Sequence, residues 1–265
     1  GQDGFDCYIG QNGERLKFYG VTNFDIKSTE YECEIVSGLS GETNDVLLNF
    51  PLYEGVCDVQ VGIDKDALIL PPKEFFDDKK IVFYGTSITQ GGCASRPGMA
   101  YTNILSRWLN RECYNYGFSG NGLGEYEMAQ ILAEVENPAI YVLDYEANAG
   151  TNGRLEASLE GFIEILREKH KDVPILVVSR IPYLADFYDE KLFARRNELR
   201  EFQRSIVEKR KSNGDKNIFF LNGHDLFDEN FDEYTVDFIH PTDLGFWKIA
   251  EGMFPLLKKI LEGRA

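Results

Sequence analysis

The sequence predicts an α/β protein in which a five-stranded parallel sheet lies between two layers of helices and follows a small β-sandwich. Beyond residue 79, short apolar runs alternate with longer amphipathic segments, which is typical of strands alternating with helices. Before residue 72, only short runs rich in Val, Tyr, Phe and Leu occur, separated by glycine turns. Pro71 and Pro72 divide the two patterns, because two prolines cannot sit inside a sheet ladder. We therefore expect a β-sandwich domain at residues 1–72, a linker at 73–78 and a second domain at 79–265.

The first domain contains no segment that resembles a long helix. In its last apolar run, Val59, Val61 and Ile63 alternate with polar residues or glycine, as in a half-buried strand. The expected strands are Leu16–Tyr19, Glu32–Val36, Val46–Phe50 and Val56–Ile63.

The second domain alternates five expected strands with five expected helices. Its strands are Lys80–Tyr84, Glu112–Tyr116, Ala139–Leu143, Ile175–Ser179 and Ile218–Leu221. Its helices lie near Met99–Arg111, Glu125–Glu134, Leu155–His170, Asp189–Lys211 and Leu244–Glu262. Such an alternation predicts a parallel sheet covered on both faces. Sheets of this kind bind their ligands beyond the carboxyl ends of the strands.

The composition narrows the possible partners and compartments. The chain carries 44 acidic and 28 basic residues, a net charge of −16, so we expect no nucleic-acid partner. No apolar run approaches the roughly 20 residues that span a bilayer, so we expect no membrane span. The five cysteines form no C-x-x-C pair and favour free thiols in a cytoplasmic compartment. The alternative of a secreted or periplasmic protein whose signal peptide has been removed stays open, because the chain begins with Gly1 rather than Met. The oligomeric state is not predicted.

Polar segments follow the expected strands, at the edge where a parallel sheet binds its ligand. They are Gly85–Gly92, Gly117–Gly122, Asp144–Gly150 and, before the last helix, Asp237–Pro241. Ser87 lies at a strand-to-helix turn, and a serine hydroxyl becomes a strong nucleophile only when a base takes its proton. His240 is the candidate base, and Asp237 is placed to orient its imidazole. This chemistry needs no metal and no organic cofactor.

The four segments, in this order, resemble the conserved blocks of the SGNH hydrolases, also called GDSL esterases or lipases. Gly85–Ile88 is similar to the first block with Thr86 in place of Asp, and Asp237-x-x-His240 is similar to the last. The third block differs more, because Glu146 and Ala149 flank Asn148 where the family usually has Gly and Asp. The resemblance implies a three-layer, flavodoxin-like αβα fold.

The resemblance also implies an oxyanion hole for the tetrahedral intermediate. Its donors would be the backbone N–H groups of Ser87 and Gly120 and the side-chain amide of Asn148. The segment Leu48–Tyr53 and the run after it are similar to the jelly-roll-like sandwich that precedes the hydrolase domain in one SGNH subgroup.

Together these observations predict a serine esterase that works through an acyl-enzyme. By resemblance, its partner would be a carbohydrate ester or another small acyl ester, and the acyl group removed would be a short one such as acetyl. Acyl transfer to another alcohol would use the same residues. Two alternatives stay open: a protein with this fold that binds an acylated glycan without turnover, and an anion- or nucleotide-binding α/β protein in which Ser87 caps a helix.

Overall fold

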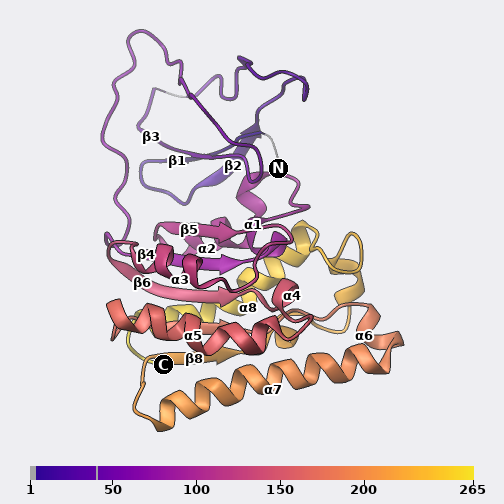
Figure 1. Cartoon of the computed structure of the whole chain (residues 1–265). Helices are drawn as coiled ribbons and strands as arrows, with labels where there is room; N and C mark the ends of the chain where they lie inside the picture. Colours follow the sequence, from indigo (N-terminus) through magenta and orange to yellow (C-terminus); the bar gives the residue numbers. More distant parts are fainter. Residues whose placement is uncertain (1–3, 40) are drawn as a thin grey trace.

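The computed structural model describes residues 4–39 and 41–265, and it contains two separate sheets (Figure 1). Residues 1–3, at the start of the expected sandwich domain, and residue 40 lie outside the described residues. The N-terminal sheet is antiparallel in the order β2-β1-β3. Its strands are β1 (Asp6–Gln11), β2 (Lys17–Val21) and β3 (Asn44–Asn49). A small β unit therefore precedes the larger one, while the boundary at 72–79 remains a prediction.

The second sheet confirms the predicted parallel, five-stranded architecture, with strand order β5-β4-β6-β7-β8. Its strands are β4 (Lys80–Gly85), β5 (Cys113–Gly117), β6 (Pro138–Asp144), β7 (Ile175–Val178) and β8 (Ile218–Leu221). Five long helices accompany it: α2 (Tyr101–Leu109), α3 (Tyr126–Ala133), α5 (Arg154–Lys169), α7 (Glu190–Ser212) and α8 (Asp243–Leu261). The short helices are α1 (Ser87–Gln90), α4 (Glu146–Ala149), α6 (Ala185–Tyr188) and the 3-10 turns Pro97–Met99, Gly223–Leu226 and Phe231–Tyr234.

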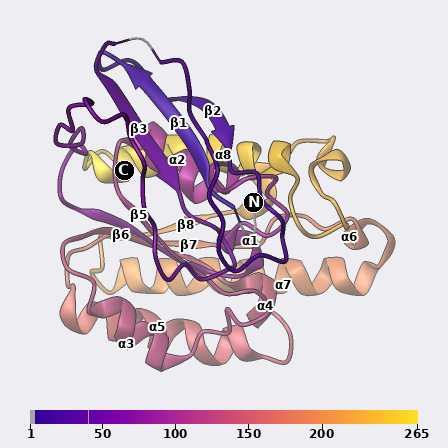
Figure 2. The same cartoon turned by 90° about the horizontal axis from the view of Figure 1, so that it is seen from above.

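The sheet separates two hydrophobic cores. Successive residues of a strand point to opposite faces, so Ile81 and Phe83 join the core under α2 and α8, whereas Val82 and Tyr84 join the core under α3, α5 and α7. Figure 2 shows α8 and α5 on opposite sides of the sheet. The helix after β4 and the helix after β6 therefore cover different faces. The carboxyl ends of these two adjacent strands form the switch point at which an open α/β sheet binds its ligand.

A buried carboxylate joins the N-terminal sheet to the larger unit. Asp6 of β1 is fully buried, and its Oδ2 accepts hydrogen bonds from Arg96 at 2.9 Å and from the Gly98 N–H at 2.8 Å. Its Oδ1 accepts one from Asn49 of β3 at 2.7 Å. Removing one partner from a buried charge pair is costly, so this contact fixes how the two units meet.

Two of the expected N-terminal strands are absent, and one strand was not expected. Glu32–Val36 and Val56–Ile63 form no strand in the described chain, and Val61 is 65% exposed. β1, by contrast, is the central strand of its sheet and is buried at five of its six positions, so it shows no alternation of polar and apolar residues. No helix in the described residues is long and apolar enough to cross a membrane. The cysteines are free thiols.

Candidate active site

The turn after β4 presents Ser87 as the first residue of α1. The Thr86 side chain caps this helix by accepting a hydrogen bond from the Ile88 N–H at 3.2 Å, while the Thr86 N–H donates to the Thr89 hydroxyl at 3.3 Å. Gly85 is required before the turn, because a Cβ there would lie 1.9 Å from Thr89 Oγ1. Thr86 therefore supports the turn by its own hydroxyl, without the usual aspartate.

The structure brings Ser87, His240 and Asp237 together, although Ser87 and His240 are 153 positions apart in the chain. Ser87 Oγ lies 2.8 Å from His240 Nε2, and His240 Nδ1 lies 2.7 Å from Asp237 Oδ2. A Nδ1–H that donates to the carboxylate leaves Nε2 as the acceptor for the serine hydroxyl. The three side chains thus have the connectivity of a nucleophile, a base and an orienting acid.

The loop before α8 holds Asp237 in its ionised form. Its Oδ1 accepts hydrogen bonds from the backbone N–H groups of His240 at 2.7 Å and Ile239 at 3.1 Å. Burial raises the pKa of Asp237, but these hydrogen bonds and the neighbouring imidazole outweigh it and hold the pKa below its usual range. Phe238 has a φ of +71°, a left-handed conformation that is uncommon for a bulky residue. The tight turn at Phe238 lets Asp237 and His240, which lie within a four-residue segment, form a hydrogen bond to each other.

The loop after β5 carries Gly120, the second expected oxyanion donor. Gly120 has a φ of +71°, which glycine adopts readily, and no atom lies within 4 Å of where its Cβ would be. The loop is tied to the nucleophile strand because the Phe118 N–H donates to the Gly85 carbonyl at 3.1 Å. A substrate can therefore approach the Gly120 backbone closely.

Asn148 lies on α4, directly beyond β6. Its Oδ1 accepts a hydrogen bond from the Gly122 N–H at 3.2 Å, so α4 and the Gly120 loop are connected. Among the described residues, its Nδ2 makes no intramolecular hydrogen bond and remains available as a donor. The structure thus places the three expected donors beyond the carboxyl ends of the adjacent strands β4, β5 and β6, and their catalytic roles remain proposals.

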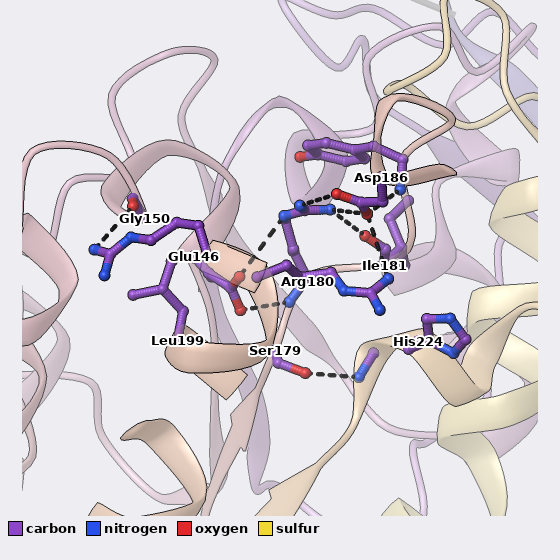
Figure 3. Close-up of polar contacts among 12 residues, drawn as sticks. Glu146, Gly150, Ser179, Arg180, Ile181, Asp186, Leu199 and His224 are labelled. Atoms are coloured by element: carbon purple, nitrogen blue, oxygen red, sulfur yellow. Dashed lines mark hydrogen bonds and ion pairs between the residues drawn. The ribbon is translucent and has the colours of Figure 1, made fainter. Parts of the chain in front are cut away.

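Glu146, which departs from the family pattern, is buried in a polar network (Figure 3). Its Oε2 accepts hydrogen bonds from the Arg180 N–H at 2.9 Å and from Gln203 Nε2 at 2.7 Å. The Arg180 guanidinium bonds Asp186 at 2.7 and 2.9 Å, and Arg196 lies 3.3 Å from the same carboxylate. Burial raises the pKa of Glu146, although its hydrogen bonds and Arg180 oppose the change. Burial raises the pKa of Asp186, but its hydrogen bonds to Arg180 and to the Tyr183 N–H, together with the Arg196 charge, outweigh burial and lower the pKa.

This network anchors the helix that carries Asn148. Sequence analysis missed it, since Arg180 and Gln203 belong to distant segments and no spacing links them to Glu146. The one available signal was the substitution of glycine by a bulky acid in the third block. A buried acid needs partners, so the substitution itself indicated a compensating donor.

The other two histidines take no part in this arrangement. His170 Nε2 lies 2.8 Å from the Ala133 carbonyl oxygen, and His224 lies beside Asp225 at 4.0 Å. Burial, with Arg196, lowers the pKa of His224. The described residues contain no group of three His, Cys, Asp or Glu side chains that could hold a metal ion.

Models of two protein families match this chain. The model of the GDSL-like lipase/acylhydrolase family matches residues 78–258. The chain belongs to this family. A second model, which describes the N-terminus of SGNH-hydrolase-type esterases, matches residues 1–69. The family resemblance predicted from the four blocks is therefore confirmed.

Solved structures share this fold over nearly the whole chain. A GDSL-like lipase from Bacteroides ovatus is 33% identical, with a TM-score of 0.85, over 98% of this chain and 75% of that one. An active-site mutant of a family two carbohydrate esterase from Clostridium thermocellum shares the fold at 19% identity and a TM-score of 0.70, over 99% of this chain and 86% of that one. A salicylyl-acyltransferase from a tetracycline biosynthetic pathway also shares the fold, at 17% identity and a TM-score of 0.67, over 97% of this chain and 75% of that one. A search of curated protein sequences found no match.

Proposed function

We propose that this GDSL-family protein is a serine esterase in which Ser87, His240 and Asp237 form the catalytic triad. The observation that carries the proposal is the unbroken hydrogen-bond chain from Ser87 Oγ through the imidazole to Asp237, with links of 2.8 and 2.7 Å. Neither a helix cap nor an anion-binding loop needs an aspartate-oriented histidine on the serine.

The reaction proceeds through an acyl-enzyme. Ser87 Oγ attacks the ester carbonyl carbon while His240 Nε2 takes the hydroxyl proton, and Asp237 stabilises the resulting imidazolium. The C–O bond to the alcohol then breaks, and His240 returns the proton to the leaving oxygen. Water attacks the acyl-enzyme with its proton passing to His240, and the proton finally returns to Ser87 as the acid leaves. The N–H groups of Ser87 and Gly120 and the Asn148 amide stabilise the oxyanion in both steps.

The proposed substrates are short-chain acyl esters, and acetylated carbohydrates come first among them. The shared fold of the carbohydrate esterase supports this choice, as does Phe238, an aromatic residue between Asp237 and His240 in the sequence that is 63% exposed and can provide apolar surface to a ligand. Acetylated oligosaccharides should therefore be better substrates than long-chain acyl esters of a simple alcohol.

Turnover of p-nitrophenyl acetate by the wild-type protein and by Ser87→Ala tests the proposal. We expect the wild-type rate to exceed that of Ser87→Ala by several orders of magnitude. Equal rates would show that the protein has no esterase function, and retained binding of an acetylated oligosaccharide would then identify a glycan-binding protein without turnover. Stabilisation by a nucleotide would instead favour an anion-binding role.

A further inference from the structure

A segment of the N-terminal region, Pro51–Tyr53, lies against the nucleophile turn. Leu52 packs on the core that contains Ile88, the residue after Ser87. Two glycines make room for the segment: a Cβ at Gly91 would lie 2.8 Å from Leu52 Cδ1, and a Cβ at Gly92 would lie 2.5 Å from the Tyr53 hydroxyl. The sequence therefore leaves space beside the nucleophile for two side chains from a distant part of the chain.

Gln90 connects this segment to the oxyanion loop. Its Nε2 donates to the Leu52 carbonyl at 3.0 Å, and its Oε1 accepts from the Ser119 N–H at 2.9 Å. Burial raises the pKa of Tyr53, while an interaction of its hydroxyl with the Ser119 side chain opposes the rise. The residue directly before Gly120 is thus hydrogen-bonded at its backbone and contacted at its side chain.

Few contacts hold Gly120 directly. Residues 118–121 are exposed, and nothing lies within 4 Å of the position of a Gly120 Cβ. An oxyanion donor works only if it is held close to the productive geometry before the reaction. The restraint on the Gly120 N–H therefore comes through its neighbours. The Asn121 N–H closes the turn onto the Phe118 carbonyl at 3.0 Å, and Ser119 between them is held by Gln90 and contacted by Tyr53.

We propose that Tyr53 and Gln90 are positioning residues for the oxyanion loop, so that the N-terminal region is a working part of the catalytic centre. This inference rests on the proposed esterase function. Tyr53 acts through Ser119. Gln90 links the same residue to the N-terminal region, because its side chain bonds both the Leu52 carbonyl and the Ser119 N–H.

Kinetics of Tyr53→Phe with p-nitrophenyl acetate test the proposal, with Tyr19→Phe as the matched control. Tyr19 also lies in the N-terminal region, and its hydroxyl donates to the Ser37 carbonyl at 2.7 Å, outside the site. Loss of the polar contact between the Tyr53 hydroxyl and Ser119 predicts a kcat about 2- to 10-fold lower for Tyr53→Phe with KM unchanged, and no change for Tyr19→Phe. Because Tyr53 acts through Ser119, adding Ser119→Ala should lower kcat no further. Wild-type kcat in Tyr53→Phe, or fully additive effects, would overturn the proposal.

Hydrogen exchange of the peptide that covers residues 117–122 gives a readout that does not depend on activity. We expect faster amide exchange in Tyr53→Phe than in wild type and Tyr19→Phe, with exchange elsewhere unchanged. Unchanged exchange in this peptide would overturn the proposal even in an active enzyme. Faster exchange in a protein that hydrolyses no ester would support the positioning contact while the proposed function failed.

Discussion

Replacing Glu146 by alanine should destabilise the protein far more than the loss of an ordinary surface ion pair. The Glu146 side chain is completely buried, accepts hydrogen bonds at 2.9 and 2.7 Å and lies 3.7 Å from the Arg180 guanidinium. Arg180 keeps its bonds to Asp186 in the variant, but the Arg180 N–H and the Gln203 amide lose their buried acceptor, which costs about 1–3 kcal/mol for each donor. For a chain of this size, the two losses together correspond to a Tm lower by roughly 4–24 °C.

Glu160→Ala is the matched control, because Glu160 pairs with Lys209 at 2.9 Å while both side chains stay largely exposed, at 40% and 59%. Such a pair contributes at most about 1 kcal/mol, so the control should lose less than about 4 °C. Thermal and urea unfolding of the two variants measure the difference. Equal losses of stability would refute the conclusion that Glu146 anchors α4.

Three further changes probe the site and the sheet beneath it. Asn148→Ala should lower kcat for p-nitrophenyl acetate by about 100- to 1000-fold if its amide is an oxyanion donor, whereas a loss below about 3-fold would exclude that role. Asp237→Asn should lower kcat by roughly 10,000-fold, because His240 is then no longer held in the required tautomer, and near-normal turnover would contradict the triad. Burial raises the pKa of Asp144 to about 6, despite its hydrogen bonds to Tyr101 and Thr89. The native state therefore keeps this proton while the unfolded state has lost it, so stability should fall by about 3 kcal/mol as pH rises from about 4 to about 6. Urea titrations of Asp144→Asn should lack that component of the fall, and an identical pH dependence in the variant would show that Asp144 is not its source.

The larger domain and the triad were predictable because their signals are local. Four of the five strands of the parallel sheet are short apolar runs among the described residues, and Ser87, Asp237 and His240 lie in short motifs at turns whose geometry the neighbouring residues impose. The Asp237–His240 loop needs only four residues to bring the acid to the base. Such features are local in the sequence, and the resemblance of the four blocks to the SGNH hydrolases pointed to the same residues.

The N-terminal region and the supports of the site were less predictable, because they depend on contacts between distant segments. An alternating run such as Val56–Ile63 predicts an extended backbone but not a partner strand, and the structure gives it none among the described residues. β1 was missed because burial on both faces removes the alternation. A local sequence pattern cannot predict the contact of Arg180 with Glu146 or that of Leu52 with Gln90. Each of these contacts joins segments that are distant in the sequence and meet only in the folded chain.

Covalent labelling by a fluorophosphonate, followed by intact-mass and peptide analysis, tests the central claim most directly. The probe reacts only with a serine that an adjacent base activates, so it needs no knowledge of the natural substrate. We expect one adduct per chain, located on Ser87, which is lost in Ser87→Ala and strongly slowed in His240→Ala. Labelling that is absent from the wild-type protein, or that persists unchanged in either variant, would contradict the assignment of Ser87 and His240 as nucleophile and base.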